Sequence, residues 1–233
     1  MGPEKGQKMT IDWAPIYDAL KLIYKEQRIS PCFKRDEEYL HDAFLTTETL
    51  WSKQFHRIRD IKVIMLSEAP LFGETQSYIY NLKSNPTAFF HFNDLRAFDT
   101  FSEFDQYTEG RIQKQVMFDQ FAKKGFLVVD LFPFALNSDF TALNYRVMKK
   151  KAYVQLLNAT LEHYLIPKLK QCSKKSIQTP LFVFRYKKLL VRTSPQVLGA
   201  IRYVFPDTRN VELNSINGTN MSLDRMKLSK ILK

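Results

Sequence analysis

Two carboxylates stand where apolar runs of the sequence end. Glu68 follows the run IKVIMLS, and Asp130 lies in the run GFLVVDLF. A carboxylate at such a place can stabilise positive charge that develops on a bound substrate, and it can orient or deprotonate an attacking water. Each acid also has an ordinary structural explanation, because loop carboxylates cap helices and tie down turns through backbone amides. Two acids at equivalent places in a basic protein favour a shared site.

The charge of the chain points to a polyanionic partner. Among 233 residues, 35 Lys and Arg face 24 Asp and Glu, which leaves a formal charge of +11. Between Arg146 and Arg192 there are twelve basic residues and one acidic residue, Glu162. Such a segment is typical either of a nucleic-acid-binding surface or of a solvated helix face. A lipid anchor is not indicated, because no continuous apolar face lies at a free end.

Cysteine content and hydropathy narrow the class of protein. Cys32 and Cys172 are far apart and form no paired spacing, so one chain assembles neither a disulfide framework nor a four-cysteine metal or iron–sulfur site. We expect no cofactor and no metal. No apolar stretch approaches the roughly 20 residues of a membrane span, and residues 1–10 lack the apolar centre of a signal peptide. We therefore expect a soluble monomer without membrane contact, in the cytoplasm, nucleoid-associated in a prokaryote or nuclear in a eukaryote.

Strand-like and helix-like patterns alternate along the chain. Apolar runs predict strands at 61–67, 125–132, 180–186 and 209–215. Apolar residues at helical spacing predict helices over 12–27 and 46–60, the second capped by Thr46 or Thr47, and further helices near 110–124, 139–170, 194–204 and 221–232. Parallel strands need such crossover helices, which cover both faces of the sheet.

This alternation predicts a single α/β domain over residues 11–233. The expected architecture is a three-layer α/β/α domain with a central, mainly parallel four-stranded sheet, and residues 11–60 form a helical extension within it. Residues 1–10 are expected to be a disordered tail or to have been added for expression. Ligands of open parallel sheets bind beyond the carboxyl ends of the strands, so we expect Glu68 and Asp130 to share one rim.

Four sequence pieces in order resemble the uracil-DNA glycosylase superfamily. SEAP after an apolar strand is similar to its first motif, written GQDPY, GEAPG or GINPG, and GFLVVDLFPFALN is similar to its second strand, written GVLLLNTVLTV in one branch. TPLFVFRYKK stands where the family has a strand and a Gly-Lys turn. VELNSINGTNMSLDRMKLSKIL resembles the final strand, the loop usually written HPSP, and the closing helix. The likeness covers roughly residues 60–233.

The sequence departs from the family at informative positions. Ser67 replaces the opening glycine of the first motif, and Leu71 stands where the uracil-excising branch has tyrosine. Asp130 replaces the asparagine that ends the second strand. The histidine of the HPSP loop has no counterpart, and its place falls near Asn214 or Asn217. A uracil-specific enzyme is not expected to lose all of these residues together.

The resemblance implies a monofunctional DNA glycosylase that flips a base out of DNA and hydrolyses the N-glycosidic bond. Glu68 would handle the water, as the corresponding glutamate does in the GEAPG branch, and Asn214 or backbone amides would stabilise the leaving base. An ionised Asp130 only accepts hydrogen bonds, so it would favour a base with an exocyclic amine over uracil. With the smaller Leu71 in place of tyrosine, we expect a C5-substituted cytosine or a related modified or damaged base.

The remaining site residues follow from the same resemblance and from the needs of base flipping. Phe90 would stack on the base, with Phe89 and Phe92 as alternatives or as plain core residues. The base-binding residues predicted in all are Ser67, Ala69, Pro70, Leu71, Phe90 and Asp130. The predicted DNA-binding residues are Arg185, Lys187, Lys188, Asn217 and Met221, with Leu223 as an alternative wedge and Lys149, Lys150 and Lys151 as distant backbone contacts.

Three classes of function stay open at this point. An excising glycosylase leads. A catalytically silent module that binds nucleic acid or modified bases follows, because the loop histidine is missing. Other α/β enzymes acting on phosphorylated or nucleotide substrates come third, since SEAPLFGETQ lacks the glycine-rich, lysine-bearing pattern of a phosphate-binding loop. A role in repair and a role in defence against invaders with altered bases are equally compatible with the sequence.

Overall fold

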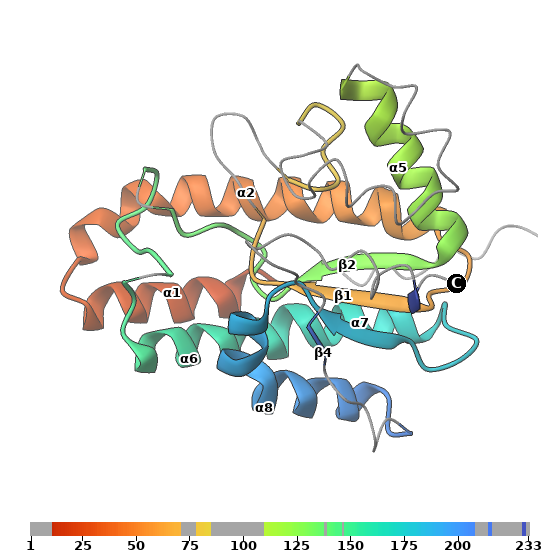
Figure 1. The fold of residues 1–233 in the computed structure, drawn as a ribbon. Helices are drawn as coiled ribbons and strands as arrows, with labels where there is room; N and C mark the ends of the chain where they lie inside the picture. The colour runs from red at the N-terminus through yellow and green to blue at the C-terminus, as the bar shows by residue number, and fades with distance from the viewer. Residues whose placement is uncertain are drawn as a thin grey trace, which may run out of the picture.

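The fold is described from a computed structural model that covers residues 11–70, 78–84, 110–137, 139–145, 147–207, 214–215 and 230–231. The protein is an α/β structure in which helices predominate (Figure 1). Side chains from the N-terminal helices and from the strands belong to one hydrophobic core. None of the helices in these ranges combines the length and the apolar character that crossing a membrane requires.

Three parallel strands form the body of the sheet. Strand β1 (Val63–Ser67) lies between β2 (Phe126–Asp130) and β3 (Leu181–Phe184), and the strand order is β2-β1-β3-β4. The expected fourth strand at 209–215 is described only as β4 (Asn214–Ser215), a two-residue pairing with β3. The first three strands are buried along almost their whole length, as their continuous apolar runs predict.

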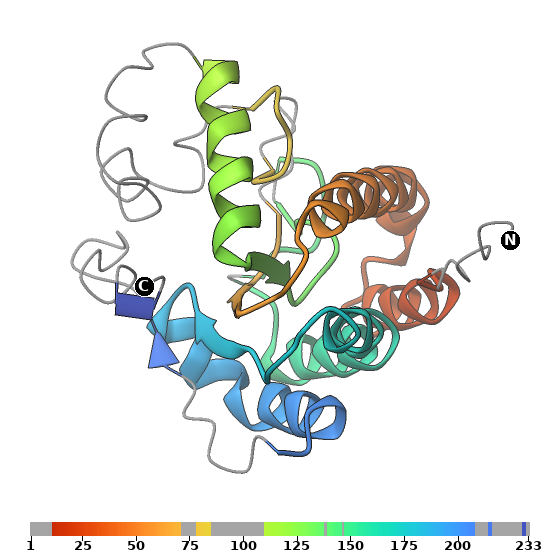
Figure 2. The same ribbon diagram turned by 90° about the vertical axis from the view of Figure 1, so that its right-hand side faces the viewer.

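Helices lie on both sides of this sheet, as Figures 1 and 2 show. Helices α2 (Ser30–Arg57) and α5 (Gly110–Lys124) lie on one side in Figure 1, and α5 packs against β2. On the other side are α6 (Lys150–Thr160), α7 (Ile166–Ser173) and α8 (Lys187–Val204), of which α8 packs against β3 and β4. Helix α1 (Ala14–Glu26) packs against α2 and α6.

Among the described residues, side chains rather than a further strand meet the outer edge of β2 at Val128. The hydroxyl oxygen of Tyr80 accepts a hydrogen bond from the backbone N–H of Val128 at 2.6 Å. The same oxygen lies 3.2 Å from the carbonyl oxygen of Val128. The indole Nε1 of Trp51, on α2, donates to the same carbonyl at 3.1 Å. An open strand edge exposes unpaired backbone groups that invite pairing with another chain. Here two aromatic residues close it.

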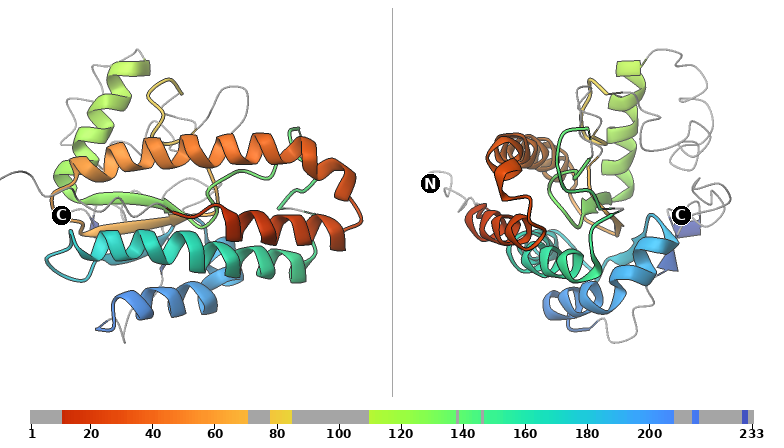
Figure 3. Two further views of the ribbon diagram at one scale, coloured as in Figure 1. Left: turned by 180° about the vertical axis from the view of Figure 1, so that it is seen from behind. Right: turned by 90° about the vertical axis from the view of Figure 1, so that its left-hand side faces the viewer.

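Several helix boundaries differ from the sequence prediction. Thr46 and Thr47 do not cap a helix, because α2 begins sixteen residues before Thr46, at Ser30, with Pro31 in its first turn. The 28-residue helix keeps a mainly apolar buried face from Phe33 to Phe55, which includes its charged first half. Figure 3 shows this helix lying lengthwise beside the shorter α1. Helix α8 likewise begins at Lys187 rather than near 194.

The predicted helix over 139–170 is correct only in its second part. Helix α6 begins at Lys150, and the described residues before it, 139–145 and 147–149, form turns and loops. The helical path then continues through a single π-helical segment, η3 (Leu161–Leu165), into α7, where Pro167 follows. Proline removes a backbone donor and crowds the preceding turn, so a widened turn directly before it accommodates the missing bond.

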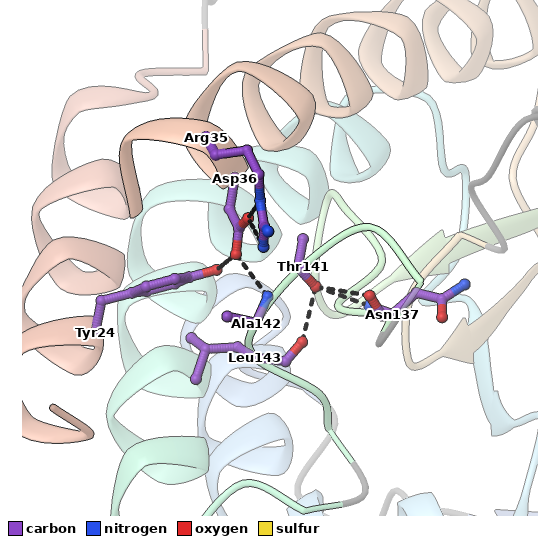
Figure 4. Close-up of polar contacts among 7 residues, drawn as sticks. All are labelled: Tyr24, Arg35, Asp36, Asn137, Thr141, Ala142 and Leu143. Atoms are coloured by element: carbon purple, nitrogen blue, oxygen red, sulfur yellow. Dashed lines mark hydrogen bonds and ion pairs between the residues drawn. The ribbon is translucent and has the colours of Figure 1, made fainter. Parts of the chain in front are cut away.

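A buried carboxylate holds the loop before α6 in place (Figure 4). Asp36 on α2 accepts a hydrogen bond from the hydroxyl of Tyr24 at 2.8 Å and from the backbone N–H of Ala142 at 2.6 Å. Arg35 donates to its other oxygen at 2.7 Å. In the loop itself Thr141 donates to the carbonyl of Leu143 at 2.7 Å. The loop therefore depends on contacts with α1 and α2, which no local sequence pattern reveals.

Candidate active site

Glu68 lies where the sequence predicts it, directly beyond the carboxyl end of β1. Two backbone hydrogen bonds fix this turn: the N–H of Leu131 donates to the carbonyl of Ser67 at 2.8 Å, and the N–H of Phe132 donates to the carbonyl of Glu68 at 3.0 Å. The segments that leave β1 and β2 are therefore held side by side. This places Glu68 on the rim at which parallel sheets bind ligands.

The Glu68 side chain is held by residues from two helices. The hydroxyl of Tyr153, on α6, donates to Oε1 at 2.9 Å, and Nη1 of Arg192, on α8, lies 3.8 Å from the same oxygen. The guanidinium of Arg192 also stacks on the Tyr153 ring, with Cζ 3.2 Å from the ring centroid. Because the Glu68 side chain remains 35% exposed, water reaches a carboxylate whose direction is fixed.

Aromatic rings form the buried side of this arrangement. Phe132 stacks on Tyr145 with 4.8 Å between centroids, and its ring meets Tyr153 edge-on at 5.4 Å. Burial raises the pKa of Tyr153, and the charge and hydrogen bond of Glu68 raise it further, so the phenol stays a hydrogen-bond donor. Burial, and then the charge of Glu68, also raise the pKa of Tyr145. Tyr153 is therefore a positioning residue for Glu68.

Asp130 ends β2 in register with Ser67, but its surroundings differ from those of Glu68. Asp130 is only 1% exposed, and neither of its carboxylate oxygens has a hydrogen-bond partner among the described residues. Burial raises the pKa of Asp130 to about 7, with Glu48 acting in the same direction and Ser67 and Lys168 acting against it. The Ser67 hydroxyl is near, although its geometry falls short of a hydrogen bond. Asp130 is therefore partly neutral near pH 7, which corrects the sequence-based assumption of a fully ionised group.

A buried ion pair forms part of the surroundings of Asp130. Nζ of Lys168, on α7, lies 2.8 Å from Oε1 of Glu48, on α2, and 3.3 Å from the ring centroid of Trp51. Lys168 is completely buried, and this burial lowers its pKa while Glu48 opposes the change. The sequence marks Lys168 only as one of the basic residues of a segment expected at the surface. Its position inside the core shows that this segment contributes less surface charge than its composition indicates.

The other predicted residues on the rim are only partly accessible. Ala69 is half-buried, and Pro70 and Ser67 are buried. Arg185 follows β3 at the expected edge, but it is only 2% exposed, so its side chain does not face solvent as a phosphate contact requires. Its position directly after a buried strand, with the backbone N–H bonded to the carbonyl of Leu66 at 2.9 Å, explains this burial.

Lys187 and Lys188 are exposed in the first turn of α8, one turn before Arg192. Lys149, Lys150 and Lys151 are exposed at the start of α6, where Lys151 lies 3.6 Å from Glu26.

Asn214 pairs with Val183 through β4, and its side chain lies outside the described part of the structure. The predicted residues Leu71, Phe89, Phe90, Phe92, Asn217, Met221 and Leu223 also lie outside the described residues.

The structure therefore brings Glu68 together with Tyr153 and Arg192, two residues that the sequence analysis did not identify as site residues. The sequence marks Arg192 only as part of the basic segment and Tyr153 only as a helical residue. Glu68 and Asp130 lie at the same end of adjacent strands, one half-exposed and one buried. Tyr145 is the described residue whose pKa is raised by both carboxylates.

The chemistry open to this region depends on the side chains that gather there. Within the described ranges, no three His, Cys, Asp or Glu side chains come together as metal ligands would. The arrangement can instead do acid–base and electrostatic chemistry, through one half-exposed carboxylate and one buried carboxyl. No protein-family model, curated protein or solved structure matches the chain.

Proposed function

We propose that the protein is a monofunctional DNA glycosylase, a divergent relative of the uracil-DNA glycosylases, that flips out a modified or damaged base and hydrolyses its N-glycosidic bond. The observation that carries this proposal is the Glu68 carboxylate at the end of β1, aimed by Tyr153 and open to water. As the base leaves, positive charge builds on the sugar, and a fixed carboxylate both stabilises that charge and takes a proton from the attacking water.

The choice of base is proposed from Asp130. Its buried oxygens have no described donor, and buried polar groups without partners are rare in folded proteins. A base with an exocyclic amine would supply the missing donor to the ionised form of Asp130, which would repel O4 of uracil. This supports a C5-substituted cytosine, or a related modified base, as the preferred substrate. Lys187 and Lys188 on α8 are proposed to contact DNA phosphates beside this site.

The first experiment measures base release and DNA binding separately. Duplexes carrying uracil, C5-substituted cytosines or other lesions are incubated with the protein, and strand breaks after alkali report abasic sites. We expect release from the modified cytosines. Glu68→Gln should reduce the rate about 10²–10⁴-fold, the usual contribution of a positioned acid–base group, without weakening duplex binding. Glu162→Gln, whose side chain is 74% exposed, is the matched control and should release bases at the wild-type rate.

Three other results would change the assignment. Strong uracil release with modified cytosines untouched would refute the proposed base preference. Duplex binding without any strand breakage would favour the silent recognition module that the missing loop histidine suggests. Turnover of free nucleotides without DNA binding would move the protein into a different class of α/β enzyme.

A further inference from the structure

The proposed reaction leaves one chemical requirement without a residue. Breaking the bond between C1′ and the base sends an electron pair to the base, which leaves far more easily when it takes up a proton. The three described histidines lie elsewhere: His41 packs against Trp13, His56 packs against Phe55, and His163 pairs with Glu162. Lys168, the buried cation in the surroundings of Asp130, is already paired with Glu48. Among the described carboxyl groups at this end of the sheet, Asp130 is the one whose surroundings favour its protonated form.

We propose that Asp130, in its neutral form, is the acid that protonates the departing base, while Glu68 accepts a proton from the attacking water. This inference rests on the proposed function and assigns the leaving-group step of the same reaction. It also gives the two carboxyl groups different tasks, which their different surroundings support. A buried carboxyl and a half-exposed carboxylate in one site can supply an acid and a base to the same reaction.

The geometry favours this division of roles. Asp130 is the register partner of Ser67, and Glu68 is the next residue along the chain. Both Asp130 oxygens lack hydrogen-bond partners among the described residues, but the residue is only 1% exposed, so the proposed step requires that the flipped base reach this buried carboxyl. Once there, a ring nitrogen and a neighbouring exocyclic group could bond to the two oxygens together. A neutral carboxyl offers one donor and one acceptor side by side, which matches N3 and the 4-amino group of a cytosine ring. It also matches the edge of uracil, so the inference concerns the departure of the base rather than its selection.

The groups around Asp130 act on its pKa in opposite directions. Burial and the Glu48 carboxylate on α2 favour the neutral form, whereas Ser67 on β1 and Lys168 on α7 favour the ionised form. The other titratable groups that interact with Asp130 electrostatically are the tyrosines Tyr78, Tyr80, Tyr145 and Tyr164. Burial raises the pKa of each of them, so they remain neutral near pH 7. Among the described residues, Glu48 and Lys168 are therefore the neighbours whose charges act on the Asp130 carboxyl.

The step balances as follows. The C1′–N1 bond breaks and its electron pair stays with the base, whose N3 takes the Asp130 proton so that the base leaves neutral. Water forms the new bond to C1′ and gives its proton to Glu68. One water is consumed, and an abasic sugar and a free base are formed. Asp130 ends ionised and Glu68 protonated, and exchange of one proton with solvent at each carboxyl restores the enzyme.

The test is the pH dependence of base release in single turnovers by the full-length protein. Duplexes carry cytosines with C5 substituents of graded electron withdrawal, and the rate is followed from about pH 5.5 to pH 9. For the wild type we expect the rate to fall above about pH 7, by tenfold per pH unit, as Asp130 loses its proton. Asp130→Asn should be about 10²–10⁴-fold slower and should lose this alkaline decline. Its loss should be largest for the poorest leaving base, since that base depends most on protonation.

Controls separate this role from a structural one. Asp139→Asn, at an exposed loop position after β2, should keep the wild-type profile. Circular dichroism and duplex affinity show whether Asp130→Asn is folded. If it is not, the carboxyl carbon resonance of Asp130 in the wild type gives its titration directly, and a midpoint below pH 5 would overturn the inference.

The outcomes also separate the inference from the proposed function. A wild-type enzyme that releases bases without the alkaline decline, or an Asp130→Asn variant that keeps it, overturns the inference and leaves the glycosylase assignment standing. An equal loss for every leaving base likewise reduces Asp130 to a positioning residue. If the wild type releases no base from any duplex, the proposed function and the inference fail together.

Discussion

Burial of the Asp130 carboxyl has a cost in stability that can be measured without any substrate. The pKa of this group is 3.8 in its unperturbed form and about 7 in the folded protein. Between these values the native state binds a proton that the unfolded chain has lost. The contribution of Asp130 to the free energy of unfolding therefore falls as the pH rises from about 4 to 7, and it is constant above that window.

Asp130→Asn should remove this dependence, because an amide does not ionise. The free energy of unfolding of the variant relative to the wild type should be on the order of 2 kcal/mol more favourable at pH 8 than at pH 5, at about 1.4 kcal/mol per pKa unit. Urea unfolding at the two pH values measures the difference. The same relative stability at both values would show that Asp130 is ionised throughout, and Asp139→Asn should show no pH-dependent difference.

At this scale the sequence predicts where the two carboxyl groups lie but not which residues contact them. Glu68 and Asp130 are marked by their positions at strand ends, because apolar runs that stop at a carboxylate are visible in the chain itself. Tyr153 and Arg192 reach Glu68 from helices 85 and 124 residues further along. Their roles depend on packing between α6, α8 and β1, which no spacing in the sequence encodes. The burial of Arg185 is hidden for the same reason.

Among the secondary-structure elements, β2 depends most on contacts outside the sheet. Its outer edge is closed at Val128 by Tyr80 and Trp51. Tyr80→Phe removes the hydroxyl that meets the Val128 N–H and leaves this buried group without that acceptor. We expect a loss of about 1–3 kcal/mol in the free energy of unfolding, the usual cost of an unsatisfied buried polar group. Thermal or urea unfolding measures it.

Tyr78→Phe is the matched control for this change. Tyr78 is equally buried and only two residues away, but its hydroxyl has no hydrogen-bond partner among the described residues. Deleting that hydroxyl should therefore change the free energy of unfolding by well under 1 kcal/mol or increase it. Equal losses in the two variants would mean that packing of the ring, rather than the bond to Val128, holds the strand edge.

Strand positions are easier to predict here than helix boundaries. Buried parallel strands read as continuous apolar runs, so β1, β2 and β3 fall inside their predicted ranges. The beginning of α2 at Ser30 is obscured by a charged stretch between its buried positions. The beginning of α6 at Lys150 is set by a loop that Asp36 and Tyr24 hold from other helices. Local patterns do not contain these long-range contacts.

For the whole molecule, the α/β class follows from the alternation of patterns, whereas the charged surface does not follow from composition. The basic segment from 146 to 192 contains Lys168 and Arg185, and both are buried. Lys187, Lys188 and Arg192 remain exposed in the first turns of α8, and Arg192 lies beside Glu68. The basic residues that could contact the proposed DNA partner are therefore identified by their exposure in the structure rather than by composition.

This location predicts a specific salt dependence of DNA binding. Each phosphate contact releases condensed counterions, so the logarithm of the binding constant falls with the logarithm of salt concentration by about 0.9 per contact. Lys187→Gln combined with Lys188→Gln should reduce that slope by about two and weaken binding to all duplexes alike, whatever base they carry. Fluorescence anisotropy with a labelled duplex between about 50 and 200 mM salt measures both quantities.

The control removes the same charge from the other end of the sheet. Lys123 and Lys124 end α5 beside the amino end of β2, away from the rim that carries Glu68. Lys123→Gln combined with Lys124→Gln should leave the slope within a few tenths of the wild-type value, because only phosphate contacts, and not net charge, enter it. If the two double variants lower the slope equally, DNA does not approach the rim at α8, and Glu68 then lies too far from the duplex to act on a flipped base.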